Sequence, residues 1–330
     1  MKLNRIKLLI AFMISVNFMN AQQDAQLSMY MFNMLQYNAG YAGSKEDPYA
    51  SAIFRTQWVG LKGAPQTLSL NFHSPLKRKQ YALGASVRGD KLGATTYANT
   101  DAYFAYRLKL DKDTKLSLGV SVGFMYYQLN MAEPIINSQK DALLNNNPNK
   151  VLPNFGFGAY AYNPKYYIGV SVPHILTSSL REAVNGANTL DTLLSSQATH
   201  VFGTAGVILG KSDMVKFKPS VMVKYVPKTP LSLDLNMSVL LQERYWIGAS
   251  YRFGGDIYEL NTGNGQFGKG NAIIGIVKFL ATREIEIGYA YEYPLSQLNL
   301  GTSASHEIML GYTFKGKNLR YVTPRYGSYF

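Results

Sequence analysis

The chain has 330 residues, a formal net charge of +13 and no cysteine, and it is 47% hydrophobic and 13% aromatic but only 16% charged. Soluble domains carry about 25% charged residues, so this chain is rich in aromatic side chains and unusually poor in charge. Without cysteine, a disulfide framework, a thiol nucleophile and a cysteine-bound zinc are excluded.

The first 21 residues have the features of a secretory signal peptide. Three basic residues precede an apolar run at residues 8–18, and the small residue Ala21 stands before Gln22. We expect residues 1–21 to be removed on export, and we disfavour a buried first helix because polar residues follow at once. For an exported basic chain, the expected acidic neighbours are lipid head groups, surface polysaccharide or an acidic protein, and not nucleic acid.

Residues 22–48 contain many Met, Phe and Tyr residues but lack the alternation of a strand. We interpret them as an ordered periplasmic segment. Its aromatic part, residues 30–41, is expected to pack into the periplasmic mouth of a barrel formed by the residues that follow. A mobile arm is the alternative, because chain termini are often disordered.

From residue 49 onward the chain alternates between apolar and polar residues. In REIEIGYAYEY, residues 283–293, Ile and Tyr fill one register and three Glu residues stand in the other. A period of two indicates an extended strand, because successive side chains leave the backbone on opposite sides. About 14 such strands are predicted, at residues 49–59, 66–73, 81–89, 97–109, 115–128, 154–162, 166–172, 200–209, 214–226, 231–241, 245–253, 271–280, 284–293 and 305–314.

The lengths of these strands, mostly about 9–11 residues, suit a tilted crossing of a hydrocarbon layer. A helical span would need about 18 consecutive apolar residues, and the mature region contains no such run. Short and long connections largely alternate, as expected when one end of every hairpin faces the periplasm and the other faces the exterior. The connections GLKGAP and PKTP are short exceptions on the outer side.

These patterns predict an all-β fold, a transmembrane antiparallel β-barrel at residues 49–314 in the outer membrane of a Gram-negative bacterium. A closed barrel leaves no unpaired backbone edge in lipid, where each unsatisfied peptide group costs several kcal/mol. An even strand number places both termini in the periplasm. Residues 315–330 then form a basic periplasmic tail with four Lys or Arg residues and no acidic residue, which either docks on an acidic partner or is simply solvated.

In a membrane barrel the apolar register faces lipid and the polar register faces the lumen. The predicted lumen charges are Lys216, Lys218, Lys224, Asp234, Arg252, Glu284, Glu286 and Glu292. They either pair across the interior or line a pore and set its ion preference. We favour pairing, because it relieves the cost of crowded charge.

Tyrosines near strand ends are typical of the aromatic girdles at the two membrane surfaces. The candidates are Tyr126, Tyr127, Tyr166, Tyr167, Tyr291 and Tyr293. The long outer connections, in turn, are the natural contact surface for a protein partner, because loops carry recognition on rigid scaffolds.

Several stretches are more specific than the barrel pattern, among them QLSMYMFNMLQYNAGYAGS, RTQWVGLKGAPQTLSLNFHSPL and the terminal HEIMLGYTF. Together they resemble the PorP/SprF family of Bacteroidetes outer-membrane proteins, over residues 26–314. The resemblance implies a component of the type IX secretion and gliding apparatus, or a dedicated partner of one secreted, adhesin-like surface protein. The candidate partner-binding residues that carry the match are Met31, Phe32, Asn33, Tyr41, Gly43, Trp58, Gly60 and Pro65.

Other motifs do not predict a catalytic, cofactor or metal site. Gly263, Gly265 and Gly268 spell GxGxxG, but they stand in a hairpin loop and not between a strand and a helix. The four histidines lack metal-ligand spacing. His73 and Ser74 are adjacent, so their side chains point to opposite faces of a strand and do not form a nucleophile–base pair.

The leading hypothesis is therefore a non-enzymatic outer-membrane barrel that binds a secreted surface protein of the type IX system and supports its export or its attachment to the cell surface. Other secretion components of the periplasm or outer membrane are further candidate partners. Two alternatives remain open: a passive porin for small solutes, and a barrel hydrolase.

Overall fold

The computed structural model describes residues 26–77, 79–130, 149–176, 199–210, 214–227, 231–255, 270–295 and 304–314. The predicted leader at 1–21, the loop glycines at 263–268 and the basic tail at 315–330 lie outside the described residues. Within these residues, no helix combines the length and the apolar character that a membrane crossing requires.

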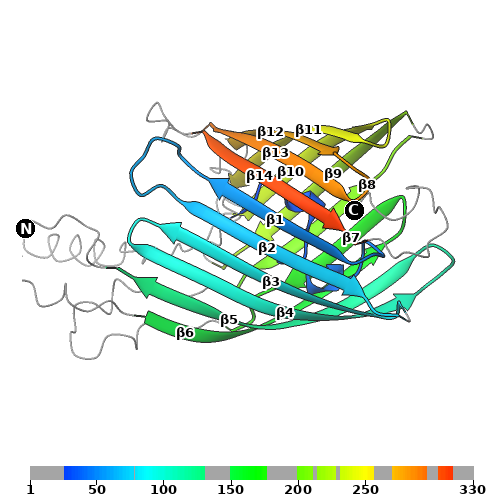
Figure 1. The fold of residues 1–330 in the computed structure, drawn as a ribbon, viewed down its shortest axis with the longest axis horizontal. Helices are drawn as coiled ribbons and strands as arrows, with labels where there is room; N and C mark the ends of the chain where they lie inside the picture. Colours follow the sequence, from blue (N-terminus) through cyan, green and yellow to red (C-terminus); the bar gives the residue numbers. More distant parts are fainter. Residues whose placement is uncertain are drawn as a thin grey trace, which may run out of the picture.

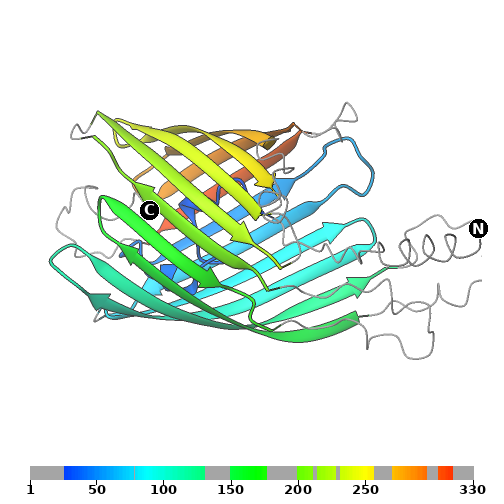
Figure 2. The same ribbon diagram turned by 180° about the vertical axis from the view of Figure 1, so that it is seen from behind.

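The described part of the chain forms a closed barrel of fourteen antiparallel strands (Figures 1 and 2). Each strand pairs with its neighbours in sequence, and β1 closes the barrel by pairing with β14. The strands are β1 (Tyr49–Thr56), β2 (Gln66–Pro75), β3 (Tyr81–Leu92), β4 (Thr95–Lys109), β5 (Lys115–Leu129), β6 (Asn149–Tyr162), β7 (Tyr166–Val172), β8 (Val201–Val207), β9 (Val215–Tyr225), β10 (Leu231–Leu241), β11 (Tyr245–Gly255), β12 (Gly270–Leu280), β13 (Ile285–Pro294) and β14 (Ser305–Thr313). The predicted all-β barrel and its strand number are confirmed.

The two registers of each strand lie on opposite faces of the barrel wall. Along β13, Ile285, Tyr289 and Tyr291 are exposed on the outside, whereas Glu286 and Ala290 are buried inside. The same alternation runs along the other strands, so apolar side chains cover the outer surface and polar ones line the interior. Such an outer surface is stable in lipid, where water does not penalise it.

A charge placed on this outer surface is expected to be costly. Leu70 lies in the middle of β2 and is 45% exposed on the outer face. We expect Leu70→Arg to lower the free energy of unfolding in phospholipid vesicles by roughly 2–4 kcal/mol, because its guanidinium would enter the hydrocarbon. Leu61→Arg, in the connection between β1 and β2, is the control and should change it by less than about 1 kcal/mol. Equal effects in a urea titration would contradict the assignment of the outer face to lipid.

Strands β4, β5 and β6 are longer than the sequence pattern predicts, with 15, 15 and 14 residues. Strand β6 begins before Pro153, although a proline inside a strand usually indicates its end. Pro153 pairs with Phe124 of β5, while β7 begins to pair with β6 only at Phe157. The missing N–H of Pro153 therefore faces the unpaired side of β6, where a strand tolerates proline.

Two of the predicted girdle tyrosines face the wrong way. Tyr166 is exposed on the outer surface, but its neighbour Tyr167 is buried in the interior, as is Tyr127. Adjacent residues of a strand point to opposite faces, so only one of each Tyr-Tyr pair can reach the membrane surface.

The two rims of the barrel differ in their connections. At one rim, here called the short-turn rim, short turns join β2 to β3, β4 to β5, β6 to β7, β8 to β9, β10 to β11 and β12 to β13. The opposite rim, the long-connection rim, carries most of the long segments. Strand β1 begins and β14 ends at the short-turn rim, where Tyr49 lies opposite Thr313. That this rim faces the periplasm remains a prediction.

Candidate functional site in the barrel lumen

Residues 26–47, here called the plug segment, lie inside the barrel. Met29, Met34, Leu35 and Tyr41 are fully buried, and the other apolar residues of the segment are nearly so. The dark blue chain in Figure 1 shows the segment between the walls of the barrel. The segment was expected to pack into the barrel mouth, and the structure places it inside the lumen.

Two short 3₁₀ helices shape the plug segment: η1 (Tyr30–Phe32) and η2 (Ala39–Tyr41). The side chain of Asn38 caps η2 by accepting a hydrogen bond from the Gly40 N–H at 2.8 Å. Asparagine favours such caps because its short side chain reaches nearby backbone groups. Asn38 also donates to the Ala159 carbonyl of β6 at 3.0 Å, so one residue both begins η2 and fixes it to the wall.

The wall is hollowed by glycine where the plug segment crosses β5 and β6. A Cβ atom on Gly119 would overlap the backbone of Ala39 and Gly40, and one on Gly158 would overlap the Asn38 side chain. These positions therefore admit the backbone of the plug segment only because they lack side chains.

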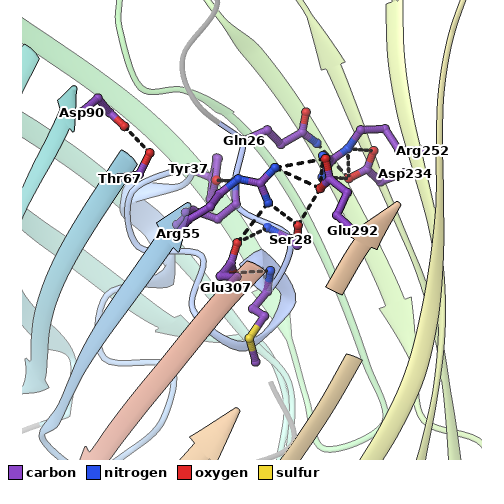
Figure 3. A network of polar contacts seen from close by, with 12 residues as sticks. Gln26, Ser28, Tyr37, Arg55, Thr67, Asp90, Asp234, Arg252, Glu292 and Glu307 are labelled. Atoms are coloured by element: carbon purple, nitrogen blue, oxygen red, sulfur yellow. Dashed lines mark hydrogen bonds and ion pairs between the residues drawn. The ribbon is translucent and has the colours of Figure 1, made fainter. Parts of the chain in front are cut away.

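Ionic contacts hold the beginning of the plug segment (Figure 3). The buried carboxylate of Glu307, on β14, accepts the backbone N–H groups of Ser28 and Met29, each at 2.7 Å. Arg55, on β1, donates to the Ser28 hydroxyl at 2.6 Å and to Glu307 at 3.4 Å. The Nη2 atom of Arg55 also donates to both carboxylate oxygens of Glu292, each at 3.0 Å.

The same network continues to β10 and β11. Arg252 forms ion pairs with Asp234 at 2.9 Å and with Glu292 at 3.1 Å. Gln26 of the plug segment donates to Asp234 at 2.9 Å. Two guanidinium groups thus face three carboxylates, and backbone N–H groups of the plug supply further donors to one of them. This arrangement satisfies charges that would be costly to bury alone.

A second network lies toward the short-turn rim. Glu286 of β13 accepts from Lys278 of β12 at 2.7 Å and from Lys45 of the plug segment at 3.3 Å, and the Tyr49 hydroxyl also donates to it. The ammonium of Lys45 lies 3.8 Å from the centre of the Tyr49 ring. This carboxylate therefore joins the end of the plug segment to the start of β1.

Lys218, buried on the inner face of β9, lies in an aromatic environment. Its ammonium is 5.7 Å from the Phe32 ring of the plug segment, 5.7 Å from the Tyr167 ring and 5.5 Å from the Trp246 ring. Cations are attracted to the faces of aromatic rings at such distances.

At the short-turn rim, Glu46 of the plug segment forms ion pairs with Arg107 and Lys115.

The plug segment therefore extends along the lumen. Its first described residues contact Asp234 and Glu307, which lie in the half near the long-connection rim. Its last residues contact Glu286 and Lys115, which lie next to the short-turn rim. The segment joins β1 at that rim.

Of the predicted lumen charges, all but one have their side chains on the inner face. Lys216 and Lys224 are buried there on β9, and Lys216 forms an ion pair with Glu243 at 2.7 Å. Glu284 is the exception, because β13 begins one residue later. Its carboxylate accepts from Thr282 within the turn at the rim.

The candidate partner-binding residues do not form one site. Met31, Phe32, Asn33, Tyr41 and Gly43 belong to the plug segment. Trp58, Gly60 and Pro65 belong to the connection between β1 and β2, where Pro65 accepts from the Gln57 N–H at 2.9 Å. Trp58 is 40% exposed and has a left-handed backbone with φ of 48°.

Sequence reasoning missed the groups that hold the plug segment: Lys45, Glu46, Arg55, Arg107, Lys278 and Glu307. A signal for four of them was present, because Arg55, Arg107, Lys278 and Glu307 stand in the polar register of their strands. Their partners were not visible, because the pairs join strands and segments far apart in the chain.

His73 and Ser74, the pair considered for a hydrolase, are not arranged as a nucleophile and its base. His73 accepts the Gly43 N–H at 3.1 Å, whereas Ser74 donates to the Pro75 carbonyl at 3.1 Å. The two side chains bind different partners. Among the described residues, no group of three or more His, Asp or Glu is placed to hold a metal ion.

A family model described as "Type IX secretion system membrane protein PorP/SprF" matches residues 19–312. A comparison with curated proteins found no match.

Among solved structures, the chain is similar to a FadL homologue of Pseudomonas aeruginosa, with 12% identity over 87% of this chain and 94% of that one and a TM-score of 0.46. It is also similar to Omp33 of Acinetobacter baumannii, with 9% identity over 81% of this chain and 98% of that one and a TM-score of 0.44. The KdgM porin in complex with oligogalacturonate has 9% identity over 81% of this chain and 99% of that one, with a TM-score of 0.35. These values are too low to transfer a function.

Proposed function

Because the chain belongs to the PorP/SprF family of type IX secretion system membrane proteins, we propose that this outer-membrane barrel binds a secreted surface protein of that system and supports its export or surface attachment. The family is not an enzyme family. The client is recognised at the long-connection rim, which faces the cell exterior. The plug segment and the wall form the rigid support beneath it.

One observation carries this proposal: the lumen is occupied by the chain's own plug segment. The segment is bound to the wall at both ends of the lumen, through Ser28 and Glu307 and through Lys45 and Glu286. Displacing the segment to let solutes pass would break this buried hydrogen bond and this buried ion pair, which is costly. A barrel whose interior is filled suits protein recognition at its rim better than it suits a porin.

Deletion of the gene in the native bacterium tests this function. We expect one surface protein to disappear from the cell exterior and to return when the wild-type gene is restored. The client should also co-purify with the native barrel from detergent-solubilised membranes. Unchanged surface proteins together with reduced uptake of small solutes would contradict the proposal and favour the porin.

The orientation of the barrel can be measured separately. Lys62 lies at the long-connection rim and Lys112 at the short-turn rim, and both are exposed. Because the chain has no cysteine, a thiol label reports only an introduced one. We expect a membrane-impermeant maleimide to label Lys62→Cys on intact cells, and Lys112→Cys only after the outer membrane is permeabilised. The reverse result would place the short turns outside.

A further inference from the structure

The barrel is closed by the pairing of its first and last strands. Strand β1 lies opposite β14 from Tyr49 and Thr313 at one rim to Thr56 and His306 near the other. This seam joins the first and the last strand, which are the two strands furthest apart in the chain. Because loop closure over so many residues costs conformational entropy, the seam is the pairing most in need of additional contacts.

The plug segment makes several buried polar contacts at this seam. Arg55 of β1 and Glu307 of β14 are opposite each other in the seam register. Ser28 binds both of them: its hydroxyl accepts from Arg55 at 2.6 Å and its N–H donates to Glu307 at 2.7 Å. A single residue of the plug segment therefore bridges the two strands.

Two further contacts lie along the same face. Asn33 donates to the Ser51 hydroxyl of β1 at 2.6 Å. Nearer the short-turn rim, Glu286 of β13 accepts from Lys45 of the plug segment and from Tyr49 of β1. The plug segment is thus bound to β14, β1 and β13 in turn.

We propose that the inner face of the seam is a peptide-binding site whose ligand is the chain's own residues 26–47, and that this ligand stabilises the pairing of β1 with β14. The site recognises a turn of the peptide backbone before η1, in which the consecutive N–H groups of Ser28 and Met29 both point to the Glu307 carboxylate. Bonds from backbone N–H groups to a buried carboxylate are among the stronger hydrogen bonds in proteins. This inference is independent of the client and of the direction in which the barrel faces.

Hydrogen exchange of the full-length protein in detergent micelles, measured by mass spectrometry, tests the proposal. Ser28→Pro removes the N–H and the hydroxyl of residue 28 and leaves the wall unchanged. Glu307→Gln removes the negative charge that β14 presents to these groups. We expect amides of β1 and β14 to exchange about tenfold faster or more in both variants, since hydrogen bonds to charged groups are lost. The pairing of β4 with β5, on another part of the wall, should change by less than about twofold.

The matched control is Glu284→Gln, which neutralises a carboxylate that accepts a hydrogen bond from Thr282 in the turn before β13. It should leave exchange in β1 and β14 unchanged. Faster exchange of residues 26–35 without any change at the seam would overturn the proposal. So would an equal increase in every strand, because the plug segment would then act only by filling the lumen.

A variant with the plug segment cross-linked to β1 keeps the proposal testable if Glu307→Gln does not fold. Asn33 and Ser51 are in hydrogen-bond contact, so Asn33→Cys and Ser51→Cys can be joined by a short bis-thiosulfonate cross-linker, from which each thiol displaces one sulfinate, in a chain that has no other cysteine. Joining them in the Ser28→Pro background should restore slow exchange in β1 and β14. If the cross-linked protein still exchanges as fast as Ser28→Pro alone, the plug segment does not stabilise the seam.

Discussion

Replacing Arg55 by methionine is expected to lower the free energy of unfolding of the barrel by roughly 3–5 kcal/mol. The Arg55 side chain is 2% exposed and forms ion pairs with Glu292 and Glu307. Methionine fills a similar volume but leaves two buried carboxylates without this partner. Removing one member of a buried ion pair is costly because the remaining charge is not compensated.

Urea titrations in phospholipid vesicles, followed by the mobility of the folded barrel in gels, measure this loss. Lys79→Met is the control, because Lys79 is 60% exposed and contacts Glu46 at 3.7 Å across the short-turn rim. An exposed ion pair of this kind contributes less than about 1 kcal/mol. If Arg55→Met were as stable as Lys79→Met, the network drawn in Figure 3 would not stabilise the fold.

Replacing Gly119 by valine is expected to displace the plug segment. The added Cβ would overlap the backbone of Ala39 and Gly40, which cannot rotate away as a flexible side chain can. We expect the free energy of unfolding to fall by roughly 3 kcal/mol, at the upper end of the usual cost of overpacking. We also expect ion conductance to appear in planar bilayers, where the wild-type protein should conduct little.

Gly275→Val is the matched control for this experiment. Gly275 lies in β12, and a Cβ atom added there meets nothing within 4 Å. Valine is a good strand residue at both positions, and only at position 119 does its side chain meet the plug segment, so the comparison reports on that contact. Equal stability and equal conductance of the two variants would show that the plug segment does not lie against β5.

The architecture of the wall could be predicted from the sequence because alternation is a local property. Which side chains of β13 face lipid follows from the period of two, without knowledge of any neighbouring strand. The inward positions of Lys218, Asp234 and Arg252 follow for the same reason. The partners of these side chains could not be predicted, because alternation does not indicate which strands face each other across the lumen.

The plug segment marks the limit of this reasoning. It has no alternation and no long helical period, so its aromatic residues indicated order and packing at the barrel mouth, but not its course through the lumen. Its position depends on features of distant strands, such as the missing side chain at Gly119 and the carboxylate of Glu307. The length of β6 was missed for a related reason. A proline usually marks the end of a strand, but Pro153 is tolerated within β6 because no neighbouring strand pairs with that side.

Ser28 is synthesised long before its anchor, because Glu307 follows it by 279 residues. Until β14 is in place, the N–H groups of Ser28 and Met29 lack the carboxylate that accepts them. The pairing of β14 with β1 and the binding of the plug segment are therefore linked, because both place Glu307 at the seam. The last strand thus closes the barrel and completes the binding site of the plug segment in the same step.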